Sequence, residues 1–337
     1  MKTRLLTIEN IGEAGEIIRQ GGLVAFPTET VYGLGASALD ESAAAKIYAA
    51  KGRPSDNPLI VHVCSKEQIG EVAENISSDA QMLIDAFMPG PLTLIVNKKD
   101  CISDGVTAGL KTVAVRFPLH EAAQALIRAA GVPIAAPSAN ISGKPSPTTA
   151  RDVMEDMDGR IDAVIDGGDC AVGVESTIVD TTRGECTILR PGGITFDMIK
   201  EVVPGIKLDK NILSSLAEDE KPISPGMKYK HYAPNAEVTV IEGEETAVQA
   251  KIRELIAANR DKKCGVLLMY NAVYDDAVMI NGGRENAEYA HNLFSALREF
   301  DRLGMDLVFA EFSENDGCGL AVKNRLYKSA AHRVIHV

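Results

Sequence analysis

Short apolar runs alternate with helical patterns along most of this chain of 337 residues, and that alternation restricts the fold to the α/β class. Before residue 205, several runs, such as 177–180 and 186–189, follow one another too closely to be joined by helical crossovers. We therefore predict a twisted mixed sheet that contains antiparallel pairs and is accompanied by helices.

A second α/β pattern begins after Pro234. Strand-like runs at residues 237–241, 265–269 and 306–310 alternate regularly with helical patterns. Such alternation predicts a small parallel sheet of open, Rossmann-like topology. Neither of the first two runs is followed by a glycine-rich phosphate loop.

The segment between the two patterns has the composition of a linker. Residues 207–230 show no clear strand or amphipathic period, and they contain Pro222, Pro225 and Gly226. The chain is longer than one typical domain, and its hydrophobic content of 45% suffices for two cores. We predict a first domain at residues 1–205, a linker at 206–234 and a second domain at 235–337.

The composition argues against several classes of protein. No run of about 18 apolar residues is present, and Glu9 and Glu13 soon follow the start, so we expect a cytoplasmic protein without a membrane span. The six cysteines are scattered without a C-x-x-C pair, which favours free thiols over a zinc site or a disulfide framework. The net charge of -12 argues against a general nucleic-acid-binding surface, although it leaves room for a local basic groove.

Two short motifs far apart in the chain place cations and polar groups in loops. They are Lys51-Gly52-Arg53-Pro54 and Pro137-Ser138-Ala139-Asn140. Residues 41–50 predict a helix that Pro54 cannot continue, so both cations should lie at its exit. One interpretation is a charged helix cap, because the negative end of the helix dipole favours cations there. The alternative is a bound polyphosphate, and three further features favour it.

These features are a polar loop and two strand positions. Residues 27–35 gather two hydroxyls, a carboxylate and a phenol directly after an apolar run. The strand that follows Pro58 carries His62, a position where histidine is ordinarily a satisfied core residue. Period-two alternation places Thr112 and Arg116 on one face of a third strand. A buried Arg116 requires a carboxylate, either from the protein or from a ligand.

Six motifs in the same order resemble those of the threonylcarbamoyl-AMP synthase family, the YrdC-like enzymes. They are Pro27-Thr28-Glu29-Thr30-Val31-Tyr32-Gly33-Leu34-Gly35, Lys51-Gly52-Arg53-Pro54, Pro58-Leu59-Ile60-Val61-His62, Pro137-Ser138-Ala139-Asn140-Ile141-Ser142-Gly143, Glu175-Ser176-Thr177-Ile178-Val179-Asp180 and Ser224-Pro225-Gly226-Met227-Lys228-Tyr229-Lys230-His231-Tyr232-Ala233-Pro234. The first five cover the first domain, and the sixth is similar to the linker peptide of the two-domain form. The resemblance implies a YrdC-like catalytic domain followed by a small Rossmann-like domain.

The resemblance also implies a reaction. L-Threonine, bicarbonate or CO2, and ATP would give threonylcarbamoyl-AMP and pyrophosphate, so that the chain would be a nucleotidyltransferase. The product would pass to a tRNA threonylcarbamoyl transferase, for modification of the adenosine beside the anticodon. Mg²⁺ would accompany ATP and be held mainly through the phosphates, without a separate protein metal site. The linker would close over ATP as a lid, whereas the plainer alternative is a surface loop.

By the same resemblance, each substrate has its own set of side chains. The catalytic phosphate cradle would consist of Lys51, Arg53, Ser138 and Asn140. Further ATP contacts would come from Asn57, Thr112, Ser146, Arg190 and Tyr232. L-Threonine would be bound by Thr30, His62, Arg116, the backbone near Ala136, and Ser176, with its carboxylate paired with Arg116.

Two other functions remain as alternatives. One is an RNA-binding module without catalysis, whose binding should weaken steeply with salt. The other is a nicotinamide-dependent enzyme that uses Gly33, Gly35 and Ala38. In a dinucleotide-binding turn the glycines directly follow the first strand, whereas here six residues separate Phe26 from Gly33.

Overall fold

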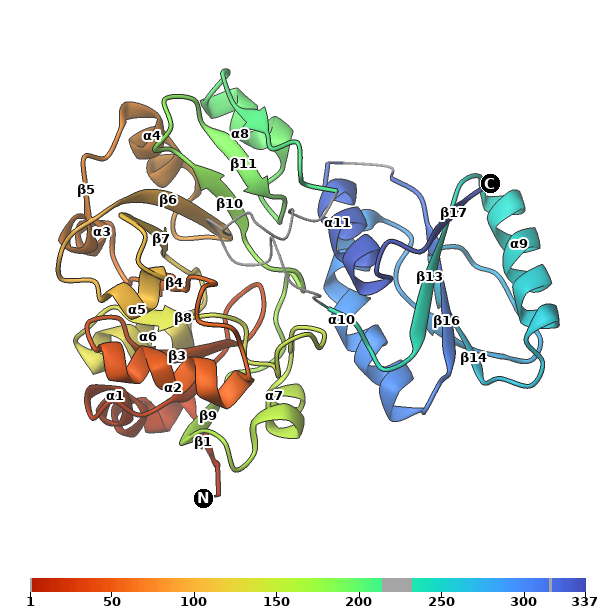
Figure 1. Cartoon of the computed structure of the whole chain (residues 1–337), viewed down its shortest axis with the longest axis horizontal. Helices are drawn as coiled ribbons and strands as arrows, with labels where there is room; N and C mark the ends of the chain where they lie inside the picture. Colours follow the sequence, from red (N-terminus) through yellow and green to blue (C-terminus); the bar gives the residue numbers. More distant parts are fainter. Residues whose placement is uncertain (1, 214–231, 315–316) are drawn as a thin grey trace. The chain divides into compact units, whose positions relative to one another are not determined.

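The computed structural model describes residues 2–213, 232–314 and 317–337 (Figure 1). The chain divides into two compact units. The larger unit contains most of the first 213 residues. The smaller unit contains the residues after 231 together with two short loops, Gly143–Pro145 and Val172–Val174. Most of the predicted linker, residues 214–231, lies outside the described residues.

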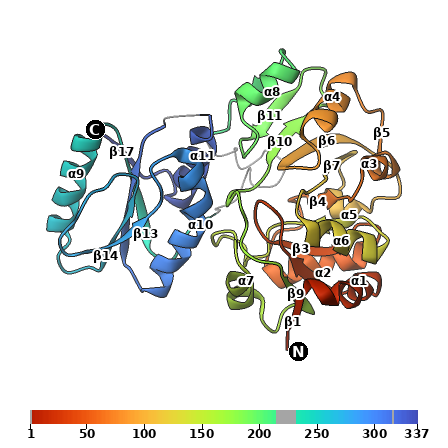
Figure 2. The same ribbon diagram turned by 180° about the vertical axis from the view of Figure 1, so that it is seen from behind.

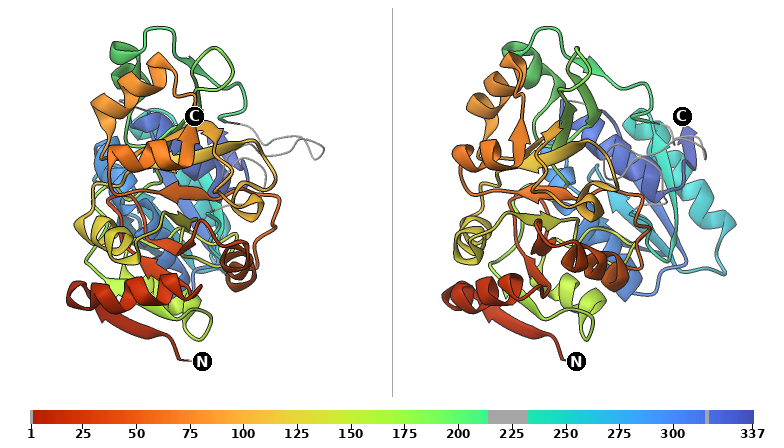
Figure 3. Two further views of the ribbon diagram at one scale, coloured as in Figure 1. Left: turned by 90° about the vertical axis from the view of Figure 1, so that its left-hand side faces the viewer. Right: turned by 60° about the vertical axis from the view of Figure 1, so that its left-hand side comes forward.

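The larger unit is built on one mixed sheet with the strand order β1-β9-β2-β3-β8-β4-β7-β6-β10-β11-β12, and β5 pairs with β6 beside this path. In Figure 3 the strands run from β1 near the N-terminus to the green β10 and β11 at the other end of the unit. The strands are β1 (Arg4–Thr7), β2 (Val24–Phe26), β3 (Gly33–Ser37), β4 (Ile60–His62), β5 (Ala73–Glu74), β6 (Leu92–Lys98), β7 (Thr112–Arg116), β8 (Ile134–Ala136), β9 (Ala163–Asp166), β10 (Thr177–Asp180), β11 (Thr187–Arg190) and β12 (Lys207–Leu208).

Both strand orientations occur in this sheet, as predicted. Strand β10 is antiparallel to β11, the pair that the sequence places too close together for a helical crossover, while β10 is parallel to β6. The accompanying helices are α1 (Ile11–Arg19), α2 (Glu41–Lys51), α3 (Lys66–Val72), α4 (Ser78–Phe87), α5 (Asp104–Thr107), α6 (Glu121–Ala130), α7 (Ala150–Met157) and α8 (Phe196–Val202), with a short 3-10 helix at Ile8–Asn10. The prediction of a mixed α/β fold is confirmed.

The smaller unit has an all-parallel sheet in the order β15-β14-β16-β13-β17. Its elements are β13 (Glu237–Glu242), α9 (Glu245–Ala258), β14 (Cys264–Leu268), β15 (Ala277–Asn281), α10 (Asn286–Arg302), β16 (Leu307–Phe312), α11 (Gly319–Ser329) and β17 (Val334–His336). The parallel topology confirms the prediction, but the sequence analysis missed β15 and β17. Both are edge strands without fully buried residues, so their side chains lack a clear apolar alternation.

One buried carboxylate organises the central strand of the smaller unit. Glu311 of β16 accepts hydrogen bonds from the backbone N–H groups of Met269 (2.8 Å) and Tyr270 (2.7 Å) and from the Tyr274 hydroxyl (2.5 Å). Burial raises the pKa of this carboxyl group above its ordinary value. Glu311 thereby ties the loop after β14 to the centre of the sheet.

None of the described helices is long and apolar enough to cross a membrane. The six cysteines are free thiols.

Seen from behind in Figure 2, α1 and α6 lie side by side, and their apolar faces contribute to one core with β2, β8 and β9. Ile18 of α1 and Leu126 of α6 are fully buried in this core.

The contact between α1 and α6 depends on a residue without a side chain. A Cβ atom on Gly15 would lie 2.7 Å from the carbonyl carbon of Ala129, closer than packed atoms approach. A Cβ on Gly12, in the same helix, would meet nothing within 4 Å. The two helices therefore approach each other closely at Gly15 and not at Gly12.

We predict that Gly15→Ala lowers the free energy of unfolding by about 1–3 kcal/mol, because α1 must move away from α6. The matched change Gly12→Ala should leave stability unchanged or raise it by up to about 1 kcal/mol, because alanine favours the helix. Urea unfolding of both variants measures the difference. Equal effects of the two changes would show that the close approach does not limit packing.

Candidate active site

Three polar side chains lie in one row across the large sheet. His62, the last residue of β4, pairs with Arg116, the last residue of β7, and Arg116 pairs with Thr93 of β6. Directly paired residues project from the same face, with Cβ atoms about 5 Å apart. Two residues earlier in these strands, the same face is apolar, with Ile60 and Ala114 in a buried cluster. The face thus becomes polar where β4 and β7 end.

The buried charge of Arg116 is compensated within the protein. Its Nη2 donates to Oε1 of Glu29 at 2.7 Å, and its Nη1 donates to the hydroxyl of Thr30 at 2.9 Å. The second oxygen of Glu29 accepts from the backbone N–H of Leu119 at 3.2 Å. The residue pattern left open whether the carboxylate that pairs with Arg116 comes from the protein or from a ligand. In the structure, Glu29 provides a protein carboxylate. Nε of Arg116 has no hydrogen-bond partner among the described residues.

His62 is buried next to this pair. Its Nδ1 lies 3.1 Å from the carbonyl oxygen of Ile60, which can only accept, so we assign the ring proton to Nδ1. The ring packs edge-on against Phe26, with the centroids 5.8 Å apart. Burial, aided by the charge of Arg116, lowers the pKa of His62 to about 3. The imidazole is therefore neutral at physiological pH, next to a fixed cation.

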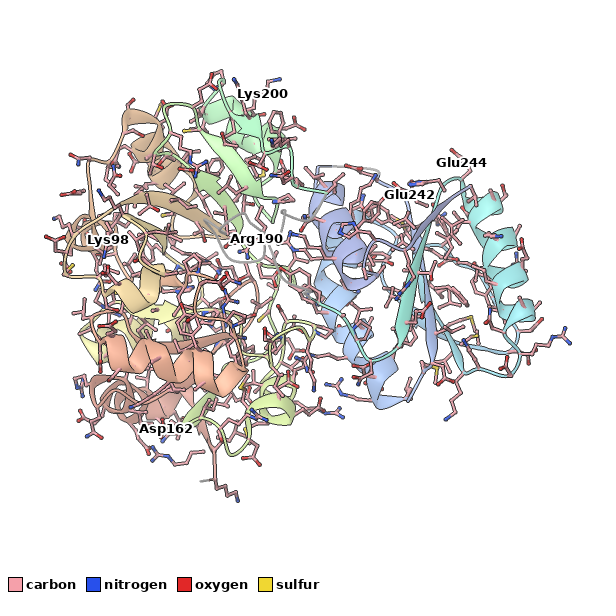
Figure 4. The ribbon with its side chains drawn as sticks, in the orientation of Figure 1. Lys98, Asp162, Arg190, Lys200, Glu242 and Glu244 are labelled. Carbon is pink, nitrogen blue, oxygen red and sulfur yellow. The ribbon has the colours of Figure 1, made fainter. Side chains whose placement is uncertain are left out.

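Ser176 connects two strands that carry further predicted residues. Its hydroxyl lies 2.8 Å from the hydroxyl of Thr93 and accepts from Nη2 of Arg190 at 3.1 Å. Nε of Arg190 also donates to the backbone oxygen of Ser176 at 3.0 Å. Arg190, labelled in Figure 4, is the last residue of β11. The structure thus joins Ser176, expected in the threonine site, to Arg190, expected in the ATP site.

Lys51 joins the two motifs that first indicated a phosphate site. Its ammonium group donates to the backbone oxygens of Ser138 and Asn140, and the Ser138 hydroxyl donates to Oδ1 of Asn140 at 2.6 Å. Helix α2 ends at Lys51, and Gly52 follows in the left-handed conformation with φ 61°. Lys51 thus contacts a distant loop, which a charged helix cap alone does not explain.

Asn57 lies near Arg53, beyond the same helix exit. Nη2 of Arg53 lies 3.4 Å from the backbone oxygen of Asn57 and 3.3 Å from that of Pro58. Asn57 is 1% exposed, and neither polar atom of its side-chain amide has a hydrogen-bond partner among the described residues. Burying such an amide without partners costs about 1–3 kcal/mol. A bound ligand that paired with the amide would recover this cost.

The remaining predicted residues are more dispersed. Thr112 is half-buried at the start of β7, so a rise of about 3.3 Å per residue places it about 13 Å from Arg116. Ser146 donates to Oε1 of Glu175 at 2.5 Å. Ala136 ends β8 and pairs with Ile60. Tyr232 belongs to the smaller unit, where its ring stacks on Phe294 with the centroids 5.1 Å apart.

Sequence reasoning assigned no role to three residues that hold the site together. Glu29 and Glu175 stand inside recognised motifs, and that position was the available signal for them. Thr93 occupies an ordinary strand position, and nothing in the sequence distinguishes it. Among residues 2–213, 232–314 and 317–337, no group of three or more His, Cys, Asp or Glu side chains could hold a metal ion.

We predict that His62 makes the folded state less stable in acid. Below its ordinary pKa of 6.5, the unfolded chain binds a proton that the folded chain excludes until about pH 3. The free energy of unfolding should therefore fall as the pH falls through this window, by up to about 1.4 kcal/mol per pH unit, and His62 should have no effect above pH ~7.

Urea unfolding of the unmodified chain and of His62→Gln, from pH 8 to pH 4.5, isolates this contribution from that of the carboxylates. The difference in stability between the two proteins should be constant above pH ~7 and should shift in favour of the variant at lower pH. A difference that stays constant over the whole range would show that His62 takes up its proton equally in both states.

Comparison with known proteins places this geometry in a family. A family model described as "Telomere recombination" matches residues 16–192, and one described as "Threonylcarbamoyl-AMP synthase, C-terminal domain" matches residues 194–331. The chain is 49% identical to the threonylcarbamoyl-AMP synthase of Pyrococcus abyssi, over 96% of this chain and 95% of that protein. It is 48% identical to the Bacillus subtilis protein of the same name, over 96% of this chain and 94% of the relative.

The fold agrees with these matches. A crystal structure of Pyrococcus abyssi Sua5 complexed with L-threonine superimposes with a TM-score of 0.94 at 47% identity, and the match covers 100% of both chains. A crystal structure of the Escherichia coli protein YciO matches the fold over 57% of this chain and 96% of YciO, with a TM-score of 0.52 at 22% identity. The chain belongs to the threonylcarbamoyl-AMP synthase family.

Proposed function

We propose that the chain is an L-threonylcarbamoyladenylate synthase, a nucleotidyltransferase that uses L-threonine, bicarbonate or CO2, and ATP. The amine of threonine bonds to the carbon of CO2 and loses a proton, or bonds to that of bicarbonate with loss of water, to give a carbamate. A carbamate oxygen then attacks the α-phosphorus of ATP. The bond from this phosphorus to the β-phosphate bridging oxygen breaks, and pyrophosphate leaves. Family membership and the relative crystallised with L-threonine support this proposal.

The burial of the cations assigned to substrates favours a small-molecule enzyme over an RNA-binding module. The four cations assigned to substrates, Lys51, Arg53, Arg116 and Arg190, are 2%, 9%, 4% and 5% exposed. A nucleic-acid surface must present its cations to phosphates along an extended backbone. Buried cations instead suit a ligand that enters the protein, as a nucleotide and an amino acid do.

The nucleotide would meet the loops that Lys51 holds together. Lys51, Arg53, Ser138 and Asn140 would neutralise and orient the triphosphate, and Asn57 and Arg190 would add contacts. Phosphoryl and adenylyl transfers depend mainly on positioning and charge neutralisation, so this site needs no protein nucleophile. Mg²⁺ bound to ATP would supply further neutralisation of the phosphate charge, held by phosphate oxygens and water.

The amino acid would meet the polar ends of β4 and β7, beside Thr30, Ala136 and Ser176. An amine must be neutral to attack the carbon of CO2 or bicarbonate. The His62 imidazole is neutral and brings no negative charge, and burial disfavours an ammonium group, so the site would lower the pKa of the bound amine. His62 would thus promote the first step by leaving the amine uncharged, while Glu29 offsets the charge of Arg116.

Product transfer and closure of the lid would take place outside the described site. The labile product would pass in the cytoplasm to a tRNA threonylcarbamoyl transferase, and the linker would cover ATP as a lid. Of the predicted linker, residues 206–213 and 232–234 are described, and the rest of the segment that would form this lid lies outside the described residues. An RNA contact by the chain itself has no observation in its favour among the described residues.

Pyrophosphate release from ATP and Mg²⁺ tests the proposed reaction. Release should require both L-threonine and bicarbonate, and a rapid mass measurement should show threonylcarbamoyl-AMP. Omitting either substrate in turn provides the control. A folded protein that releases no pyrophosphate with all substrates present would overturn the proposal, and salt-sensitive RNA binding by that protein would favour the alternative.

Asn57 allows a sharper prediction. Asn57→Leu removes an amide that has no partner in the described protein, so the free energy of unfolding should be unchanged or higher. If ATP pairs with this amide, KM for ATP should rise about tenfold or more, equivalent to at least about 1.4 kcal/mol. KM for L-threonine should change less. Loss of stability together with unchanged KM for ATP would show that the amide serves the fold.

A further inference from the structure

Thr93 lies between side chains assigned to both substrates, yet it has no assigned role. It is fully buried near the start of β6, opposite Arg116 of β7. Its hydroxyl lies 2.8 Å from that of Ser176, and no other hydrogen bond of the Thr93 hydroxyl is found within the described parts of the chain. A valine would fill nearly the same volume at this position, so packing alone does not explain a hydroxyl there.

The number of donor protons limits which hydrogen bonds the Thr93 and Ser176 hydroxyls can make. Thr93 and Ser176 bring one hydroxyl proton each, and the bond between them uses one. Arg190 can only donate, so it adds a further proton to Ser176 and accepts none. Whichever hydroxyl donates to the other, one hydroxyl proton is left without an acceptor among the described residues. This fully buried pair is therefore rich in donors, and an acceptor atom of a ligand would satisfy it.

The positions of Thr93 and Ser176 favour the arrangement in which Thr93 donates to Ser176 over the reverse. Ser176 directly precedes β10, at the same sheet edge as the ends of β4 and β7, whereas Thr93 lies within β6. A ligand at that edge reaches Ser176 first. When Thr93 donates to Ser176, both lone pairs of Ser176 are filled, by Thr93 and by Arg190. Ser176 can then only donate, and its proton is available for an acceptor atom of a ligand at this edge.

We propose that Thr93 is a positioning residue that fixes Ser176 as a hydrogen-bond donor to an acceptor oxygen of the bound amino acid. This inference rests on the proposed function, because that function assigns Ser176 to the amino acid. Thr93 acts through Ser176 and does not touch the substrate itself. Because Arg190 shares the same hydroxyl, Thr93 also sets how the guanidinium group is held beside the nucleotide.

The test compares three variants of the full chain. Thr93→Val removes the hydroxyl at nearly constant volume, and Thr93→Ser restores it. Thr3→Val is the matched control, because Thr3 is also a buried threonine, whose hydroxyl donates to the backbone oxygen of Ile161 at 2.8 Å near the opposite end of the sheet. Calorimetric binding of L-threonine and KM values from pyrophosphate release are the measurements, and urea unfolding monitors stability.

We expect Thr93→Val to weaken L-threonine binding about tenfold, which corresponds to about 1.4 kcal/mol, with KM for ATP changed less. Thr93→Ser should bind L-threonine within about twofold of the unmodified chain. Thr3→Val should lose stability by about 1 kcal/mol while keeping the KM for L-threonine. Rescue by serine is a result that a purely structural role for the threonine side chain does not give.

Two results would overturn the inference and leave the proposed function in place. One is unchanged L-threonine binding by Thr93→Val. The other is equal weakening by Thr93→Val and Thr93→Ser, which would assign the effect to shape. If the folded, unmodified chain neither binds L-threonine nor releases pyrophosphate, the proposed function fails and the inference fails with it. The unmodified protein therefore separates the two failures.

Discussion

The ion pair between Arg116 and Glu29 is the interaction on which the arrangement of the site depends. It joins the end of a central strand to the polar loop after β2, and the same guanidinium group holds Thr30. Both partners are buried, so each charge pays a large desolvation cost that the other offsets. Removing either partner from such a pair typically costs about 3–5 kcal/mol, because the remaining charge stays buried. The position of this loop is therefore strongly coupled to the position of β7.

Lys51 plays a comparable part on the nucleotide side, with backbone oxygens in place of a carboxylate. Its ammonium group orients the carbonyl groups of Ser138 and Asn140 and thereby shapes the loop between them. Both proposed subsites are thus organised by buried cations that belong to regular elements, β7 and α2. Electrostatic stabilisation is most effective when the charged groups are fixed before the reaction begins.

The sequence could predict the parts of this site but not how they are joined. The mixed sheet, the parallel sheet and the polar loops follow from local periodicity and composition, and the motifs supplied most site residues. The row of His62, Arg116 and Thr93 depends on strand register, which is a long-range property that no local pattern contains. For the same reason the sequence did not identify Glu29 as the partner of Arg116: the residues predicted only a carboxylate, and the resemblance pointed to that of L-threonine. Thr112 shares a face with Arg116 as predicted, but the length of β7 separates them.

The smaller unit is not continuous in the sequence, and this affects how the chain responds to proteolysis. The backbone N–H of Ala233 donates to the oxygen of Gly143 at 2.9 Å, and Arg298 donates to the oxygen of Pro145 at 2.6 Å. Gly173 is held against the backbone of His291, where a Cβ atom would lie 2.4 Å away. A single cut between residues 213 and 232 would break the covalent chain but none of these contacts. The two fragments of a nicked molecule would remain joined through one folded unit.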